Sequence, residues 1–206
     1  MSVPKKSVAI IGYSGHAYVV IDIFKLSGRS VTVYCDQERK ADNPYHLDYL
    51  GREQDVLEQL KEYDYFVAVG DNRIRENIYT YLNNELLRPA ANAIHATAVL
   101  ADTVKIGNGV MISAGSLVNP MAIIGNGVIC NTGCIVEHEC IIGDFAHIAP
   151  GAVLCGNVRV GHGSFVGANS VIRQGITIGR QVMIGAGSVV VKDIPDNTTI
   201  WGNPAR

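Results

Sequence analysis

The hydrophobic positions of the chain follow two different patterns, which meet near Pro89. After this residue an aliphatic side chain returns at every sixth position from Ile94 to Val190, and sixteen of the seventeen positions are aliphatic while Cys130 is the other. An α-helix repeats near 3.6 residues and an open strand at 2, so neither produces this pattern. A period of six predicts short strands joined by turns and wound into a parallel β-helix, with these side chains pointing inward.

A second period of eighteen residues lies over the first. Stacked coils of three strands each place residues i and i+18 side by side, about 4.8 Å apart. Glycines recur at this spacing, namely Gly107, Gly125, Gly143, Gly161 and Gly179. Small residues stand two positions before many inward aliphatics, and we expect them to pack in the core; they are Ser116, Ala122, Cys134, Cys140, Ala146, Ala152, Ser164, Ser170 and Ser188.

The first part of the chain alternates strand and helix patterns. Apolar strands are predicted at 8–11, 31–34 and 66–69, and helices at 17–26, 53–62 and 73–87, the last with Asp71 or Asn72 as its N-cap. The polar segment 39–51 is predicted as a loop. This order favours a small parallel sheet covered by helices. We therefore predict a Rossmann-like α/β domain over residues 1–88 and a β-helix domain over residues 89–206.

Composition narrows the partners and the compartment. The net charge is −2 and no basic block is present, which disfavours nucleic acid or an anionic membrane as partner. No apolar run approaches the roughly 18 residues of a membrane span, and Gly12 interrupts the short segment at 8–11. The five cysteines form no CxxC pair and are expected as reduced thiols. These features predict a cytoplasmic protein.

His138 is the first candidate for chemistry. It stands two residues after the inward Val136, so its side chain is expected to leave the core, and an imidazole titrates near neutral pH and suits a general base. The adjacent Glu139 could fix its tautomer. Gly156 follows eighteen residues later and is expected beside His138 on the next coil, where its N–H could stabilise an oxyanion. A surface histidine and a turn glycine are the alternatives.

The first part contains a candidate phosphate site. Gly12 and Gly15 follow a predicted strand and open a predicted helix, and helix N-termini with glycines accept phosphate oxygens. The full G-x-G-x-x-G fingerprint is absent, so a dinucleotide is not implied. Asp36 follows the second strand, where an acid often contacts a ribose or a base.

Several segments together resemble a known family. The aliphatic–glycine repeat and the closing Gly202-Asn203-Pro204-Ala205-Arg206 resemble the hexapeptide-repeat acyltransferases. Four further segments narrow the resemblance to N-acetyltransferases of nucleotide-linked 4-amino-4,6-dideoxy sugars in bacterial glycan biosynthesis, and to their sialic-acid O-acetyltransferase relatives. These segments are Ile11-Gly12-Tyr13-Ser14-Gly15-His16, Val69-Gly70-Asp71-Asn72, Glu137-His138-Glu139-Cys140 and His147-Ile148-Ala149-Pro150. The resemblance runs over essentially the whole chain.

The resemblance implies more than the residues do. It implies a left-handed β-helix, a homotrimer with active sites between subunits, acetyl-CoA as co-substrate and an amino sugar linked to UDP. It assigns His138 and Glu139 to catalysis, and acetyl-CoA contacts to His147, Gly156, Ala168 and Ala186. Substrate contacts are implied for Ser14, Gly15, His16, Asp36, Gly70 and Asn131. Tyr13 stands where the family often has a small residue.

Three other hypotheses stay open at this point. The same machinery could acetylate a hydroxyl of a sialic-acid-like sugar, which would need no nucleotide site. A trimeric zinc hydratase on this helix would need three histidines around a metal, but the spacings of His138, His147 and His162 do not resemble that pattern, and no metal site is predicted. A non-catalytic scaffold would lose no activity on replacement of His138.

Overall fold

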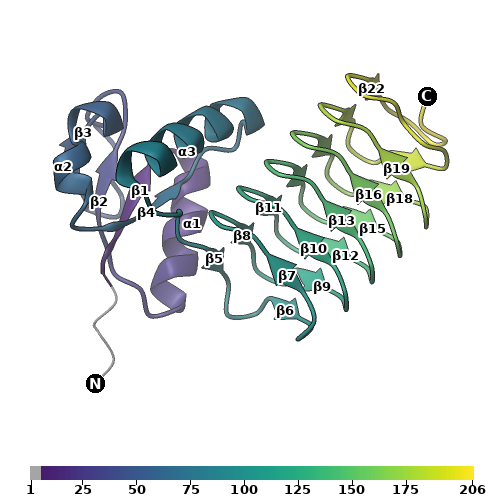
Figure 1. Ribbon diagram of the computed structural model, residues 1–206, viewed down its shortest axis with the longest axis horizontal. Helices are drawn as coiled ribbons and strands as arrows, with labels where there is room; N and C mark the ends of the chain where they lie inside the picture. The colour runs from purple at the N-terminus through teal and green to yellow at the C-terminus, as the bar shows by residue number, and fades with distance from the viewer. Residues whose placement is uncertain (1–5) are drawn as a thin grey trace.

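The computed structural model describes residues 6–206 and contains an α/β part and a long β-helix (Figure 1). The α/β part lies beside the first coils, and the later coils extend away from it toward the C-terminus. The architecture changes between α3, which ends at Leu86, and β5, which begins at Ala93. Within residues 6–206 no helix combines the length and the apolar character needed to cross a membrane.

The α/β part is built on sheet A, a parallel sheet of four strands in the order β3-β2-β1-β4. Its central strand β1 is fully buried, as expected for a parallel sheet that is covered on both faces. The strands are β1 (Val8–Ile11), β2 (Val31–Cys35), β3 (Asp48–Gly51) and β4 (Asp64–Val67). The helices are α1 (Gly15–Leu26), the 3-10 turn η1 (Glu53–Asp55), α2 (Leu57–Leu60) and α3 (Asn72–Leu86).

Three predicted elements of this part need correction. The segment 39–51 was expected as a loop but ends in β3, an edge strand whose sequence Asp-Tyr-Leu-Gly has no apolar run to reveal it. The expected helix at 53–62 is divided into η1 and α2, because Val56 has a non-helical φ of −126°. The last strand begins at Asp64, two residues earlier than expected, because its first residue is polar.

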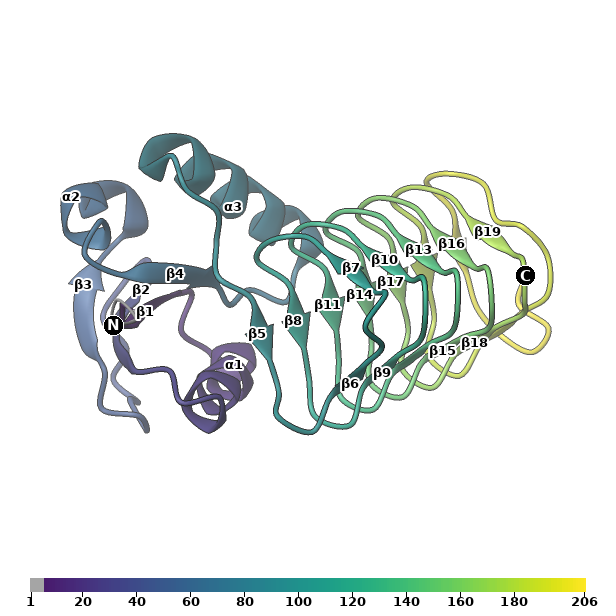
Figure 2. The ribbon, with the colours of Figure 1, turned by 60° about the horizontal axis from the view of Figure 1, so that its bottom comes forward.

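The β-helix has three faces, each a parallel sheet of two-residue strands (Figure 2). Sheet B consists of β5 (Ala93–Ile94), β8 (Met111–Ile112), β11 (Ile129–Cys130), β14 (His147–Ile148), β17 (Phe165–Val166), β20 (Met183–Ile184) and β22 (Thr199–Ile200). Sheet C consists of β6 (Val99–Leu100), β9 (Leu117–Val118), β12 (Ile135–Val136), β15 (Val153–Leu154), β18 (Val171–Ile172) and β21 (Val189–Val190). Sheet D consists of β7 (Lys105–Ile106), β10 (Ile123–Ile124), β13 (Ile141–Ile142), β16 (Arg159–Val160) and β19 (Thr177–Ile178).

The predicted inward positions form the core of this helix. From Ile112 to Val190 every sixth residue is buried, whereas the first three positions, in the open first coil, are only partly buried. Residues eighteen apart pair across neighbouring coils, as Ile124 does with Ile142. The recurring glycines permit this stacking, because a Cβ on Gly125 would lie 2.7 Å from the amide nitrogen of Asp144. Both predicted periods are therefore confirmed.

The hydrophobic clusters on both sides of sheet A extend to the β-helix. On the α1 side, the outward residues Met111 and Ile129 of sheet B join the core of the α/β part. On the α3 side, Phe145 packs edge to face against Tyr79 at a ring separation of 5.3 Å. The two parts therefore share their hydrophobic contacts.

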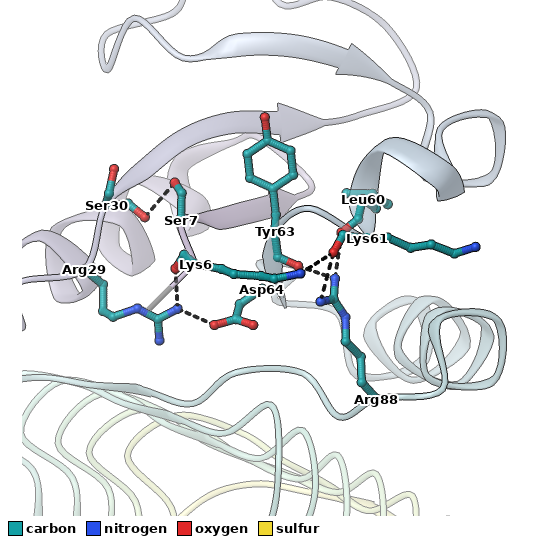
Figure 3. A network of polar contacts seen from close by, with 9 residues as sticks. All are labelled: Lys6, Ser7, Arg29, Ser30, Leu60, Lys61, Tyr63, Asp64 and Arg88. Atoms are coloured by element: carbon teal, nitrogen blue, oxygen red, sulfur yellow. Dashed lines mark hydrogen bonds and ion pairs between the residues drawn. The ribbon is translucent and has the colours of Figure 1, made fainter. Parts of the chain in front are cut away.

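A polar network joins the amino ends of the strands of sheet A (Figure 3). Arg29 on the α1–β2 connection reaches Asp64 at the start of β4, at 2.6 Å, and the carbonyl of Lys6, at 3.0 Å. Arg88, which lies between α3 and the first coil, donates to the carbonyls of Leu60 and Tyr63. This network ties the entry into the β-helix to the amino ends of the strands. The carboxyl ends of the strands remain free for a binding site.

Candidate functional site

The imidazole of His138 lies directly over Gly156 of the next coil. A Cβ on Gly156 would be 2.5 Å from Cε1 and 2.6 Å from Nε2 of His138, so only glycine leaves the ring in this place. His138 Nδ1 lies 3.1 Å from Oε2 of Glu139. The two side chains are 52% and 63% exposed, which leaves them accessible to a substrate.

Backbone hydrogen bonds hold these residues at the corner between sheets C and D. The amide of Glu139 donates to Pro120 of the preceding coil at 3.0 Å, and the amide of Asn157 donates to the His138 carbonyl at 2.9 Å. Glu139 adopts a left-handed φ of 61° at this turn. Gly156 is a buried residue, and within residues 6–206 its N–H has no hydrogen-bond partner. The corner therefore presents an open ring nitrogen beside an unused amide.

A second group of predicted residues lies at the glycine-rich turn between β1 and α1. Gly12 has a φ of 86°, and a Cβ there would meet Val69 Cγ2 at 2.8 Å, so the turn requires glycine. Ser14 is the N-cap of α1, but its side chain makes no capping bond, and the first turn of this twelve-residue helix carries no acid. The N-terminal amides of α1 are consequently open to an anion.

Asp36 has both carboxylate oxygens engaged within the chain. Oδ2 accepts the amide of Tyr13 at 2.8 Å, while Oδ1 accepts the amide of Gln37 at 2.7 Å and lies 3.0 Å from Lys40 Nζ. These bonds join the glycine-rich turn to the end of β2. The Asp36 carboxylate thus shapes the crevice that it lines, and its contact with a ligand stays a prediction.

His16, Gly70 and His147 meet where the α/β part touches sheet B. Burial, followed by the charge of Arg75, lowers the pKa of His16 to about 4 and that of His147 to about 3. The side-chain nitrogen of Asn131 lies 3.1 Å from Nε2 of His147. His16 Nε2 and His147 Nδ1 are buried and have no hydrogen-bond partner in the described chain. These neutral rings thus carry polar atoms that a ligand could satisfy.

A cavity continues from this junction along the β-helix. It has a volume of about 320 Å³ and is bounded by Gly70 and Asn72 at the start of α3 and by Phe165 and Met183 of sheet B. The ring of Phe165 packs edge to face against His147 at 4.8 Å. The cavity therefore extends from the predicted substrate residues toward the later coils.

One chain does not bring all predicted residues together. Nine residues, half of an eighteen-residue coil, separate His138 from His147. His138 leaves the corner between sheets C and D, and this corner is opposite sheet B, which carries His147. Ala168 and Ala186 lie at the corner between sheets B and C, eighteen residues apart. Sheet C thus separates these alanines from Gly156.

The histidines of the zinc hypothesis do not converge, since His138 is exposed at one corner of the β-helix whereas His147 is buried on sheet B. His162 Nε2 pairs with Glu76 of α3 at 3.1 Å, and His95 contacts Thr97. Among residues 6–206, no three His, Cys, Asp or Glu side chains converge in a group that could hold a metal ion.

Arg75 is a residue of the junction that the sequence analysis did not single out. Its guanidinium is 1% exposed and donates to the carbonyls of Gly127 and Phe145 in the β-helix, each at 2.8 Å. It also donates to Val69 and Gly70 at 3.1 and 3.0 Å. The spacing of Arg75 with Tyr79, Leu82 and Leu86 places it on the buried stripe of α3, and this spacing is the signal that could have revealed it.

The chain matches two family profiles and several solved structures. The profile of the PglD N-terminal domain matches residues 7–82, and that of the hexapeptide repeat of succinyl-transferase matches residues 157–192. PerB from Caulobacter crescentus, solved in complex with CoA and GDP-perosamine, is 36% identical over 100% of this chain and 99% of its own, with a TM-score of 0.91. The acetyltransferase domain of PglB from Neisseria gonorrhoeae, in complex with acetyl coenzyme A, is 35% identical over 98% of both chains, with a TM-score of 0.92.

These matches first define a class, the hexapeptide-repeat acyltransferases, whose β-helix is left-handed. Within that class, the chain belongs to the family of sugar N-acetyltransferases that includes the perosamine N-acetyltransferase of Caulobacter crescentus. A further structure, WeeI from Acinetobacter baumannii, is 23% identical over 97% of this chain and 98% of its own with a TM-score of 0.81, and shares the fold.

Proposed function

We propose that the protein transfers an acetyl group from acetyl-CoA to the 4-amino group of a nucleotide-linked amino-dideoxy sugar. The observation that carries the proposal is the His138 ring resting on Gly156 with Glu139 at 3.1 Å from Nδ1. Sugar N-acetylation itself follows from the family. The parts that we propose are the general base and the identity of the sugar substrate.

His138 acts as general base in this proposal. Nδ1–H of His138 donates a hydrogen bond to Glu139, which holds the tautomer whose Nε2 lone pair is free. As the sugar nitrogen attacks the thioester carbon, Nε2 takes its proton, the C–S bond breaks and CoA leaves as a thiolate that is then protonated. The carboxylate beside the ring stabilises the imidazolium formed in this step.

Gly156 and the two alanines suit the acetyl-CoA side. The unpartnered N–H of Gly156 is a donor for the negative charge that develops on the acetyl oxygen. Acetyl-CoA supplies the acetyl group as an activated thioester. Ala168 and Ala186 are small residues at a partly or fully exposed corner, where a long flexible chain can approach the backbone.

The α/β part and the junction suit the nucleotide-linked sugar. The open N-terminus of α1 at Ser14 and Gly15 is placed for the diphosphate. His16 and His147 lie next to the cavity that would receive the sugar, since His16 contacts Gly70 and His147 packs on Phe165, and both of these residues line it. Asn131 lies beside His147. The resemblance implies UDP, whereas PerB is in complex with GDP-perosamine. Which nucleobase the substrate of this protein carries is therefore a separate question.

A homotrimer completes the site in this proposal. Because His138 and His147 leave opposite sides of one helix, a sugar held near His147 can reach only the His138 of a neighbouring copy. Sheet C offers the surface for such contact. Its outward residues are aliphatic from end to end, and they are Val99, Leu117, Ile135, Val153, Val171 and Val189.

The test is turnover of acetyl-CoA, followed by release of the CoA thiol, with a panel of nucleotide-linked 4-amino sugars. We expect His138→Ala to lower kcat by about 10²–10⁴-fold, the range for loss of a general base, with an unchanged circular dichroism spectrum. Lys105→Ala on sheet D is the control and should retain full activity. Turnover that survives His138→Ala contradicts the mechanism, and acetylation of a free sialic-acid-like sugar in place of the nucleotide-linked ones contradicts the substrate class.

A further inference from the structure

A small crevice opens at the carboxyl ends of β1, β2 and β4, next to the glycine-rich turn. Its volume is about 200 Å³, and aliphatic side chains line much of it. Ile11 and Val69 come from the sheet side, while Ile74 and Ile78 come from α3. Ile74 is 52% exposed, so its side chain is accessible from the crevice. Such walls suit the faces of a planar ring, and the carboxyl ends of a parallel sheet are the usual place for a nucleotide.

Two polar side chains, Gln37 and Glu53, line the same crevice. Their loops are joined, because the amide of Asp36 donates to the Gly51 carbonyl and Arg52 Nε donates to the Gln37 carbonyl, each at 3.2 Å. Within residues 6–206, neither the Glu53 carboxylate nor the Gln37 side-chain amide makes a hydrogen bond. Both oxygens of Asp36 already have partners within the chain, and Ser14 lies at the helix N-terminus proposed for the diphosphate, which leaves Gln37 and Glu53 as the polar groups that can read the edge of a base.

The negative charge of Glu53 acts at the end of β2. Burial raises the pKa of the Cys35 thiol to about 12, and the Glu53 carboxylate is the next cause. An anionic group thus stands close to the carboxyl end of the strand that leads into the crevice.

The nucleobases differ in what they offer to a carboxylate. Guanine presents two adjacent donors, N1–H and the N2 amino group, which match the two oxygens of a carboxylate in a bidentate, charge-assisted pair. Uracil and thymine present one N–H between two carbonyl oxygens, and a carboxylate repels those oxygens. The Gln37 amide can donate to O6 of guanine at the same edge.

We propose that Glu53, assisted by Gln37, selects guanine, so that the sugar substrate of this protein is linked to GDP. The inference rests on the proposed function and specifies its substrate. It differs from the uridine nucleotide that the family resemblance implies, and the complex of PerB with GDP-perosamine supports it.

Binding of nucleoside diphosphates to the intact protein, measured by calorimetry, tests the inference. We expect GDP to bind at least about tenfold more tightly than UDP, and about tenfold more tightly than IDP, which lacks only the N2 amino group, because one charge-assisted hydrogen bond is lost. Glu53→Gln should weaken GDP binding by about tenfold or more and leave UDP unchanged or tighter. Glu62→Gln, at an exposed site away from the crevice, should bind all three as the wild type does.

Each other outcome overturns the inference. Three results would do so: UDP binding as tightly as GDP, a GDP preference retained in Glu53→Gln, or no binding of any diphosphate. If Glu53→Gln fails to fold, the comparison of GDP, IDP and UDP with the wild-type protein decides alone. Turnover separates this failure from failure of the proposed function. Acetylation of a UDP-linked rather than a GDP-linked 4-amino sugar contradicts only the role of Glu53, whereas acetylation of neither contradicts the proposed function.

Discussion

At the scale of single residues, the His138–Gly156 contact joins two parts of the sequence that are eighteen positions apart. The ring lies over the one residue type that leaves space for it, since a Cβ would meet the imidazole at 2.5 Å. The φ of Gly156 is outside the left-handed region, so alanine is compatible with the backbone there. The glycine is therefore needed for the ring and not for the turn.

Gly156→Ala should displace the imidazole and lower kcat/KM by about 10²-fold, comparable to the low end of removing a general base, with a change in unfolding free energy below about 1 kcal/mol. The matched comparison is the double variant with His138→Ala. Once the ring is absent, Gly156→Ala should cost no further activity. Additive losses in the double variant would show that the glycine acts independently of the histidine.

Buried histidines at the junction also make stability depend on pH. The folded-state pKa values of His16 and His147, about 4 and about 3, lie below the ordinary 6.5, so the unfolded chain binds more protons between these values. Stability is therefore lost as the pH falls below 6.5, by about 2 kcal/mol for each ring at pH 5. In urea unfolding at pH 7.5 and pH 5, His147→Gln should lose about 2 kcal/mol less than the wild type. An equal loss in both proteins would contradict this assignment.

At the scale of elements, α3 is the part that joins the α/β sheet to the β-helix. Within residues 6–206 its Arg75 pairs with no carboxylate, and the guanidinium donates to carbonyls from two coils and from the β4–α3 connection. Burial lowers the pKa of Arg75 to about 10, so the group is still charged at neutral pH.

Arg75→Met should lower the unfolding free energy by about 3–5 kcal/mol, because several buried carbonyls lose their donor at once. Arg73→Met, two residues earlier on the exposed side of α3, should change it by less than about 0.5 kcal/mol. Chemical denaturation followed by circular dichroism measures both. Similar small effects would mean that water replaces the guanidinium without loss.

At the scale of the whole molecule, the aliphatic stripe on sheet C is the surface that one chain leaves without a partner. Val99, Leu117 and Val171 are 61%, 37% and 37% exposed, and residues of the same kind continue along every coil between them. Contact between copies along this stripe would bury it and bring the two halves of the proposed site together.

Val171→Glu should convert the proposed homotrimer into monomers and abolish acetyl transfer, while each chain keeps its β-helix because the side chain points outward. Ile123→Glu on sheet D, a position 40% exposed, is the matched control and should remain trimeric and active. Light scattering after size exclusion gives the mass of each. If the Ile123 variant dissociates and the Val171 variant does not, the contact between copies lies on sheet D and not on sheet C.

The β-helix could be predicted closely because its contacts are periodic. Ile124 pairs with Ile142, as the repeat requires, and the same rule brings Gly156 to His138. The α/β part has no such repeat, so its elements could be predicted less closely. The edge strand at Asp48–Gly51 depends on pairing with β2, and Val56 divides a helical pattern. Asp36 was expected at a ligand; tertiary hydrogen bonds join its carboxylate to Tyr13 and Lys40 at the lining of the crevice, and its contact with a ligand stays a prediction.

The sequence by itself determined the six-residue winding and the stacking of residues eighteen apart. The physical reason is that aliphatic side chains at every sixth position share one core when the chain winds into coils of three short strands. The sequence also determined the glycine turn that opens α1. The spacing of nine residues, half a coil, likewise puts His138 and His147 on opposite sides of the helix. Only the tertiary structure decided that Arg75 is buried at the junction and that His16 meets His147 there. It alone left Gln37 and Glu53 as the free polar groups of the crevice. These features depend on how the α/β part docks on sheet B and how its loops meet, and such contacts between distant segments carry no period in the sequence.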